Sequence, residues 1–517
     1  MKRWKIVSRV TCLALALVMA FSLTACSQTP PAAQTPPAPT YKDTLTVAVA
    51  SDMTSLDPHV GKEIAAVVVT NNIFATLVSL TPEGEVAPYV AESWKQVDDK
   101  TFDFQIRKDI KFHDGSSLTA NDVVFSLNRA IKSSYVSYIV NYISSVEKLG
   151  DYSVRIKLKA PYVGALINLA VPFAAIVPQA AVEANPDGFL QHPIGCGPYK
   201  FVEWNHGNNV KITRFDGYFL GPAKTKDIVF RIIPEATQRT IALENGEVDL
   251  VYDLPVNDLA RVKGDSKLKL FSNPSLQTWY MSMNTKDPIL SNKLVRQAIR
   301  SAIDTKAIID SVLYGAGAPA NSIVPPAARG YVESCPFYKQ DIDKAKALLA
   351  QAGYPNGIKL TLAVAEDVTR VAVCQIIQNQ LQKVGVEVTI NVFDASTYYT
   401  HANQKEFQLA FYFWICSAGH ADYQYYSLLH SSQHGAGGNR SFFSNTEADK
   451  LIVQGRSTVV LQENLAAYTA LEKILDEEVP NVLLCYTNLN VGASAKVQGF
   501  VMHPAGYHNL ETVSVQQ

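Results

Sequence analysis

Beyond residue 40 the sequence contains no apolar run that approaches the roughly 20 residues needed to span a bilayer. It also lacks an excess of charge of either sign, because its formal net charge is −1 at pH 7. A balance this close to zero argues against nucleic acid or an acidic membrane face as the main partner. The hydrophobic share of 47% and the charged share of 18% are ordinary for a globular protein, and 517 residues allow several cores.

Motifs for well-known catalytic chemistry are missing as well. The sequence has no His-Glu-x-x-His, Gly-x-Ser-x-Gly, Cys-x-x-Cys or phosphate-loop pattern. We therefore predict no enzymatic activity, no catalytic residue, no metal and no cofactor. A secreted hydrolase with an unfamiliar site is the competing hypothesis from a different class of function.

Cysteine is sparse and scattered, with seven residues in the chain. Two of them, Cys12 and Cys26, belong to the N-terminal stretch described next. The remainder are odd in number and widely spaced, so they do not form a disulfide framework, although one pair among them stays an open alternative. We expect most of them to be small buried hydrophobic residues. They are Cys196, Cys335, Cys374, Cys416 and Cys485.

The first residues have the composition of an export signal. Four basic residues precede an apolar run over residues 10–21, and small residues follow it, ending at Cys26. This order is typical of a secretory signal peptide. Leu23-Thr24-Ala25-Cys26 resembles the lipobox of bacterial lipoproteins, which implies removal of residues 1–25 and a diacylglycerol on the Cys26 thiol. The alternative is an ordinary signal peptide with an accidental cysteine.

Residues 26–40 read as a tether. They contain five prolines and neither an aromatic nor a charged residue, so they have little to bury in a core. Proline restricts the backbone to extended conformations, and about 3.1 Å per residue gives a reach of roughly 40 Å. The sequence thus predicts a lipid, a spacer and then a large domain that works in water.

The region after residue 40 alternates between strand and helix patterns, which favours α/β layering. Thr119 to Asp122 is a capping-box pattern that opens a helix running to about Ala130. A second region begins near Asn284. Other predicted strands are 44–50, 101–107, 154–158, 201–204, 210–214, 248–254, 386–392 and 409–415, and other predicted helices are one capped by Thr237 and ended by Gly246, then 294–303, 342–352 and 374–384.

Several short stretches of the sequence can be recognised together as a set. They are Ser55–Pro58, Val86–Trp94, Phe102–Arg107, Lys111–Gly115, Leu118–Leu127, Gly195–Tyr199, Gly246–Asp249, Met283–Thr285, Arg296–Ile299 and Ala302–Asp304. Together they resemble one family, the bacterial extracellular solute-binding proteins of family 5, which serve ABC importers of oligopeptides, dipeptides and nickel. No single stretch is decisive, but the set follows the family order over residues 44–517.

The resemblance implies a two-lobed, periplasmic-binding-protein-like α/β fold. Lobe I would comprise residues 41–282 with an inserted subdomain at about 60–190, lobe II would comprise 283–485, and 486–517 would return to lobe I. The implied protein is a monomer, lipid-anchored at the extracytoplasmic face of a bacterial membrane. It would enclose a short peptide or similar small solute and deliver it to the transmembrane subunits of an ABC permease. A nickel or metal-chelate complex, or another small solute, is the alternative ligand.

Three positions depart from the family pattern. Cys196 stands where the family usually has threonine, a small-for-small change. An aspartate after a tryptophan-containing strand commonly binds the peptide ammonium group in this family, and the resemblance implies that Asp422 is its counterpart here, although its spacing from Trp414 is longer than expected. The alternative for Asp422 is a solvated loop aspartate. Arg370 lies near the position of the arginine that binds the carboxylate in dipeptide binders, but it is displaced.

Aromatic residues are candidates for the walls of the cleft, because their faces bury varied side chains. Core packing is the alternative for each of them. Besides Asp422, the predicted ligand-binding residues are Trp414, Trp279, Tyr280 and Tyr252.

Three histidines, His420, His430 and His434, could suit nickel, copper or zinc. Their spacings of ten and four residues are not framed by carboxylates or cysteines. We expect them instead to be solvent-facing loop histidines.

Overall fold

The computed structural model describes residues 40–61, 63–81, 84–333, 339–458 and 460–517. The chain divides into a short unit, residues 1–41 with residue 517, and a second unit, residues 42–516, which contains every helix and strand below. The predicted signal peptide and the lipidation site Cys26 lie outside the described residues. Within the described ranges, no helix is long and apolar enough to cross a membrane.

Eleven strands form a mixed sheet in the order β10-β11-β12-β1-β13-β19-β14-β18-β16-β17, with β15 attached to β19. Strand β18 lies between β14 and β16 and is a continuous apolar run whose first four residues are buried, as expected where both faces of a sheet are covered. The bounds are β1 Thr44–Val49, β10 Tyr199–Asn205, β11 Asn209–Arg214, β12 Asp227–Ile232, β13 Leu250–Val251, β14 Leu268–Met283, β15 Gly317–Pro319, β16 Ile358–Ala365, β17 Val386–Phe393, β18 Leu409–Ile415 and β19 Asn481–Ser494.

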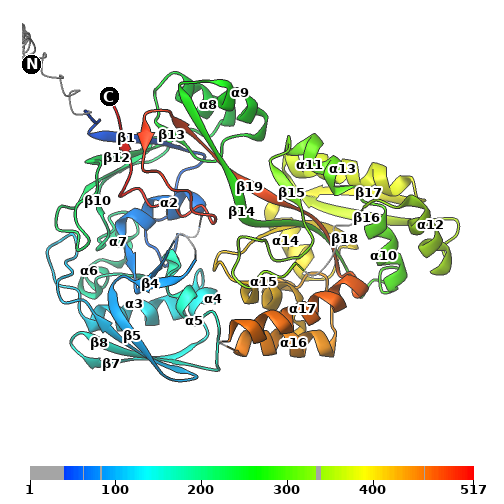
Figure 1. Ribbon diagram of the computed structural model, residues 1–517, viewed down its shortest axis with the longest axis horizontal. Helices are drawn as coiled ribbons and strands as arrows, with labels where there is room; N and C mark the ends of the chain where they lie inside the picture. Colours follow the sequence, from blue (N-terminus) through cyan, green and yellow to red (C-terminus); the bar gives the residue numbers. More distant parts are fainter. Residues whose placement is uncertain (1–39, 62, 82–83, 334–338, 459) are drawn as a thin grey trace, which may run out of the picture. The chain divides into compact units, whose positions relative to one another are not determined.

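The two longest strands, β14 and β19, connect two groups of elements. Residues 268–274 of β14 pair with residues 488–494 of β19, residues 278–282 pair with residues 481–486, and the ladder shifts register between these segments. Figure 1 shows the green β14 and the red β19 running side by side from one group to the other. This is the two-lobed α/β fold that the sequence predicted. The predicted lobe boundaries stay predictions. The shifts in register between β14 and β19 occur between residues 274 and 280 of β14, before the predicted boundary at residue 282.

A second sheet, in the order β5-β6-β8-β7, packs with helix α3 inside lobe I. Alternation in β6 buries Phe102, Phe104 and Ile106. Val123 and Leu127 of α3 belong to the same core. Strand β6 therefore buries every second side chain, as the alternation in the sequence predicted. The bounds are β5 Ala91–Asp98, β6 Thr101–Ile106, β7 Ile143–Gly150, β8 Ser153–Leu158 and α3 Ala120–Lys132.

The remaining helices cover the sheets or connect their strands (Figure 1). In lobe I they are α2 Ile64–Ile73, α4 Ser137–Val140, α5 Ala165–Asn168, α6 Gln179–Ala184, α7 Pro186–Phe189, α8 Ala236–Glu244 and α9 Leu259–Gly264. In lobe II they are α10 Lys293–Ser301, α11 Thr305–Val312, α12 Ile342–Gln351, α13 Val368–Gln382, α14 Ala395–Asn403, α15 Ala421–Leu429, α16 Thr446–Ser457 and α17 Leu461–Glu478. Three small ladders pair β2 Ala75–Thr76 with β9 Ala175–Ile176, β3 Val78–Leu80 with β4 Val86–Pro88, and β20 Val497–Gln498 with β21 Ser514–Val515.

Helix α3 ties the loop after β1 to the rest of lobe I. The predicted capping box is present, because the Thr119 N–H donates to Asp122 Oδ2 at 2.9 Å. At the other end of the helix, Arg129 donates to both carboxylate oxygens of Asp57, at 2.8 and 2.5 Å. Its Nη1 also contacts His59 Nδ1 at 2.9 Å. One stretch that resembles the family, Ser55–Pro58, is thus bound by α3, the helix that begins within another, Leu118–Leu127.

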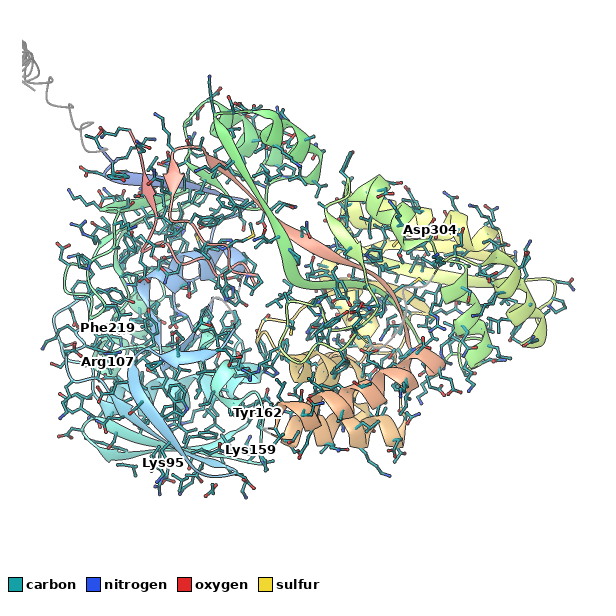
Figure 2. The ribbon with its side chains drawn as sticks, viewed as in Figure 1. Lys95, Arg107, Lys159, Tyr162, Phe219 and Asp304 are labelled. Carbon is teal, nitrogen blue, oxygen red and sulfur yellow. The ribbon has the colours of Figure 1, made fainter. Side chains whose placement is uncertain are left out.

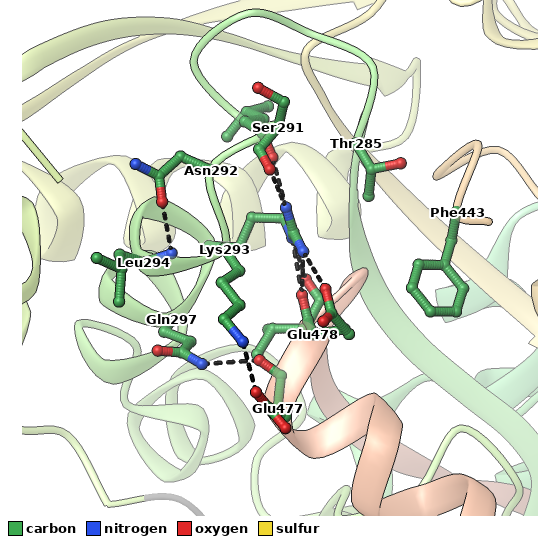
Figure 3. Close-up of polar contacts among 12 residues, drawn as sticks. Thr285, Ser291, Asn292, Lys293, Leu294, Gln297, Phe443, Glu477 and Glu478 are labelled. Atoms are coloured by element: carbon green, nitrogen blue, oxygen red, sulfur yellow. Dashed lines mark hydrogen bonds and ion pairs between the residues drawn. The ribbon is translucent and has the colours of Figure 1, made fainter. Parts of the chain in front are cut away.

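Helix α10 is fastened to the end of α17 by Arg296, which is buried. Its Nε donates to the Glu478 carbonyl at 2.8 Å, and its Nη1 donates to the Leu290 carbonyl at 2.8 Å. Figure 3 labels Glu478, which accepts from this guanidinium, and shows the neighbouring ion pair between Lys293 and Glu477. Since the guanidinium satisfies carbonyls that a helix end leaves unpaired, this residue has a structural role.

Two expected elements of lobe I differ from the structure. Helix α8 begins after Glu235 rather than at Thr237, because the Glu235 carbonyl already accepts the helical bond from the Arg239 N–H at 3.1 Å. The predicted strand over residues 248–254 shrinks to β13, since Asp253 turns the chain with a φ of 53°.

One expected helix of lobe II starts earlier than residue 374. Helix α13 begins at Val368, because the Asp367 side chain caps it by accepting from the Arg370 N–H at 2.8 Å.

Candidate functional site

A cavity of about 470 Å³ lies where the two lobes meet. Its wall combines segments that are far apart in the chain, including α2, the β3–β4 hairpin, residue 276 of β14, the loop after β18 and the segment between β20 and β21. The lining residues are Thr70, Asn71, Phe74, Thr76, Ser79, Leu80, Thr81, Gly84, Pro88, Tyr89, Ile167, Ala170, Val171, Pro172, Ala175, Leu220, Leu276, Ala327, Ser417, Ala418, Gly419, Val501, Met502, His503, Pro504, Tyr507, Asn509, Glu511 and Thr512.

The chemistry of this wall is that of a small-molecule site. Phe74, Tyr89 and Tyr507 supply aromatic surface, and Asn509 supplies an amide group. Among the described lining residues, Glu511 is the only side chain of the acidic or strongly basic types. Mostly apolar walls with a few placed polar groups are typical of pockets that orient a bound solute.

The loop after β18 reaches the cavity through a tight turn. The Cys416 N–H donates to the Leu276 carbonyl at 2.8 Å, and the Gly419 N–H donates to the Cys416 carbonyl at 2.7 Å. Gly419 has a φ of 70°, a left-handed conformation that glycine adopts without strain. The turn places Ser417 and Ala418 in the wall.

Asp422 lies behind this loop, in the first turn of α15, and is not among the lining residues. The residue is 2% exposed, and its Oδ2 atom is 3.8 Å from Nη1 of Arg456 on α16. Burial raises the pKa of the Asp422 carboxyl to about 6, against the opposing effect of the Arg456 guanidinium. The predicted contact with a ligand ammonium group stays a prediction, and the carboxylate already has one cation beside it.

The four predicted aromatic residues lie on different sides of the sheet, and none is among the residues that line the cavity. Trp279 packs on Phe411 in the core of lobe II, whereas its neighbour Tyr280 points to the other side of β14 and contacts Tyr412.

The other two aromatic candidates, Tyr252 and Trp414, pack against segments adjacent to the cavity but do not line it. Tyr252 is buried in lobe I beside His508, which belongs to the segment between β20 and β21. Trp414 packs on Tyr423 next to the loop that lines the cavity. The ligand-binding roles of all four residues stay predictions.

Contacts between the lobes gather beside the cavity. His420 Nε2 lies 2.9 Å from Asn168 Oδ1, and the Arg456 guanidinium lies over the Tyr162 ring at 4.8 Å from its centroid. Figure 2 labels Tyr162, which faces the helices of lobe II. Burial lowers the pKa of His420 to about 3, and Arg456 adds to the effect. His420 is 3% exposed, so our expectation of a solvent-facing histidine is wrong for this residue, because lobe I covers the loop.

The three histidines weighed as metal ligands have other partners. His430 Nδ1 lies 2.8 Å from the Ser432 hydroxyl, and His434 Nε2 lies 2.9 Å from the Phe443 carbonyl. Over the described part of the chain, no group of three or more His, Cys, Asp or Glu residues could hold a metal ion.

The departures from the family pattern are accommodated in the fold. Cys196 is buried in a turn that packs on α2, and a Cβ atom at Gly195 would lie 2.1 Å from the Ile73 carbonyl oxygen, which explains the glycine. Arg370 stacks over the Phe413 ring at 4.4 Å and does not line the cavity.

The prediction of buried, unpaired cysteines is confirmed for the four that are described, since all are buried and free. Cys335 lies outside the described residues. The four are Cys196, Cys374, Cys416 and Cys485.

Sequence reasoning missed the part of the wall that comes from the end of the chain. Glu511 and its neighbours follow β20 and have no periodic pattern or motif that points to a ligand. The one available signal is that Glu511 directly follows a stretch, residues 497–510, without any Asp, Glu, Lys or Arg, and this signal is weak.

Comparison with known proteins agrees with this architecture. The family model described as "Bacterial extracellular solute-binding proteins, family 5 Middle" matches residues 85–436. The chain is 30% identical over 485 residues to the "Glutathione-binding protein GsiB" of Shigella dysenteriae serotype 1 (strain Sd197), and the match covers 91% of this chain and 94% of that protein.

Solved structures give the same result for the fold. The periplasmic binding protein DppA from Helicobacter pylori, in complex with peptide STSA, has a TM-score of 0.80 at 27% identity, covering 92% of this chain and 98% of that one. NikZ from Campylobacter jejuni, in complex with Ni(L-His), has a TM-score of 0.76 at 25% identity, covering 89% and 95%. With its two lobes and a family match over residues 85–436, the chain belongs to the bacterial extracellular solute-binding proteins of family 5.

Proposed function

We propose that this protein is the extracytoplasmic solute-binding subunit of an ABC importer, that it captures short peptides or similar amine-bearing solutes, and that it performs no chemistry on them. The observation that carries the proposal is the cavity walled by both lobes, since a ligand held there contacts each lobe and stabilises their closed arrangement. Relatives named for glutathione and for a bound peptide support this ligand class.

Closure over the ligand requires a hinge, and we propose that β14 and β19 provide it. The register of their ladder breaks between Pro274 and Thr278, opposite residues 486–488. At a β-bulge in the two strands that connect the lobes, backbone torsions can change without breaking regular ladder hydrogen bonds. On β19 the proposed hinge coincides with residue 486, where the chain was predicted to return to lobe I. On β14 it lies before residue 282, the predicted end of the first part of lobe I.

The ligand class can be tested with protein purified under native conditions. Mass spectrometry of the co-purified solute should identify intact short peptides or other amines, and adding them to emptied protein should reduce the radius of gyration in small-angle scattering. Recovery of a nickel–histidine complex instead would favour the alternative suggested by NikZ. Breakdown of the solute in proportion to protein concentration would favour the hydrolase hypothesis.

Membrane attachment is proposed to depend on Cys26. Replacing Cys26 by serine should move the protein from the membrane fraction to the soluble fraction or leave the leader uncleaved, because two acyl chains are needed for firm anchoring. Immunoblots of fractionated cells measure this. Cys12→Ala, within the predicted leader, is the matched control and should leave the protein in the membrane fraction. Normal cleavage and retention of Cys26→Ser would contradict the anchor.

A further inference from the structure

Glu511 is set apart within the cavity by its charge. The described lining residues include no aspartate, lysine or arginine beside it. His503 also lines the cavity, but burial lowers its pKa to about 4, so its ring is neutral near pH 7. The Glu511 carboxylate therefore meets no counter-charge from the described wall.

The backbone on both sides of Glu511 is held in place. Its N–H donates to Asn509 Oδ1 at 3.0 Å, and its carbonyl accepts from the Lys224 N–H at 2.9 Å. The Oε2 atom of its side chain is enclosed and has no hydrogen-bond partner among the described residues. Burial also raises the pKa of this carboxyl, as expected for an acid removed from water, against the opposing effect of hydrogen bonds with the Tyr218 and Asn509 side chains. The arrangement leaves a positioned acceptor that a ligand can satisfy.

We propose that Glu511 binds the positively charged ammonium group of the captured solute, an inference that rests on the proposed function. An ammonium group supplies both the missing charge and up to three N–H donors, so its contact with Oε2 is a charge-assisted hydrogen bond. For a carboxylate of the ligand, the described wall offers neutral donors such as Asn71, Asn509 and Ser417. The cavity therefore selects amines, and it favours cationic over anionic solutes.

The proposal differs from the sequence-based choice of Asp422 in a way that can be measured. Both carboxylates have oxygen atoms without a hydrogen-bond partner among the described residues, but Asp422 lies outside the lining and has the Arg456 guanidinium 3.8 Å away. Glu511 lines the cavity, and no Lys or Arg is among the described lining residues. Neutralising one or the other carboxylate should therefore have different effects on recognition of an amine.

The test uses the tetrapeptide Ser-Thr-Ser-Ala and its N-acetylated form as probes in isothermal titration calorimetry. Wild-type protein should bind the free amine at least about 30-fold more tightly, because acetylation leaves the enclosed carboxylate unpaired. Glu511→Gln keeps the shape and removes the charge, so this variant should bind both forms with similar affinity. A purely structural role of Glu511 would weaken both forms together and preserve their ratio.

Asp422→Asn is the matched variant and should retain the preference for the free amine. Circular dichroism melting confirms that each variant is folded. Retention of the full preference by Glu511→Gln, or its loss in Asp422→Asn alone, would overturn the proposal while leaving the peptide-binding function in place. Absence of binding of either probe to wild-type protein would overturn the proposed peptide function, and the role of Glu511 with it.

Discussion

Replacing Asp57 by alanine is expected to lower the free energy of unfolding by about 3 kcal/mol or more. Asp57 is fully buried and accepts two hydrogen bonds from Arg129, at 2.8 and 2.5 Å, and one from the His59 N–H at 2.9 Å. The substitution removes all three bonds and leaves the guanidinium without its partner. Among the described residues, the loop after β1 then keeps only the contacts of His59 with Arg129 and with the Ser133 hydroxyl as polar ties to the end of α3.

Urea unfolding followed by circular dichroism measures this effect. The matched control is Glu147→Ala, since Glu147 and Lys157 form an ion pair at 2.8 Å with both side chains 43% exposed. Pairs this exposed contribute at most about 1 kcal/mol, so the control should change stability little. A loss for Asp57→Ala no larger than that of the control would show that the buried pair does not stabilise lobe I.

Replacing Glu472 by glutamine is expected to stabilise the protein at pH 8 and to have little effect near pH 4.5. Glu472 on α17 is buried and accepts hydrogen bonds from the Ser322 hydroxyl at 2.5 Å and the Tyr425 hydroxyl at 2.6 Å. Burial raises the pKa of its carboxyl from 4.5 to about 7, against the opposing effect of these two hydroxyls. The folded protein thus retains a proton between these pH values that the unfolded chain has lost.

The sign of the pH effect follows from this difference in proton binding. The contribution of Glu472 to stability is greatest below about pH 4.5, falls as the pH rises to about 7, and is constant above it. At about 1.4 kcal/mol per pH unit, the charged acid costs about 3 kcal/mol at pH 8. Glutamine keeps the shape, can still accept from the hydroxyls and carries no charge, so it should recover most of that amount.

Thermal unfolding of both proteins at pH 4.5 and pH 8 provides the measurement. Glu463→Gln is the control on the same helix, because Glu463 is exposed, and it should change stability by less than about 0.5 kcal/mol at each pH. An equal shift of Glu472→Gln at both pH values would contradict the protonation argument and leave only a packing effect.

The sequence by itself determined the family and the general fold, because its recognisable residues are those that hold the backbone together. Asp57 pairs with Arg129, Asp122 caps α3, and Arg296 binds the end of α17. Each contact requires one residue type at one position, so the pattern can be read without coordinates. Composition was sufficient for β18, a continuous apolar run whose bounds match the prediction residue for residue.

The tertiary structure alone decided which residues wall the cavity. Segments near residues 70, 418 and 511 become neighbours only when the two lobes fold and the chain returns through β19. Asp422 was the candidate ligand residue in the sequence, but folding placed it outside the wall with Arg456 beside it, and placed Glu511 in the wall without a neighbouring Lys or Arg among the described lining residues. Local patterns report the elements that a stretch forms, whereas the charge and exposure of a site depend on what distant segments place around it.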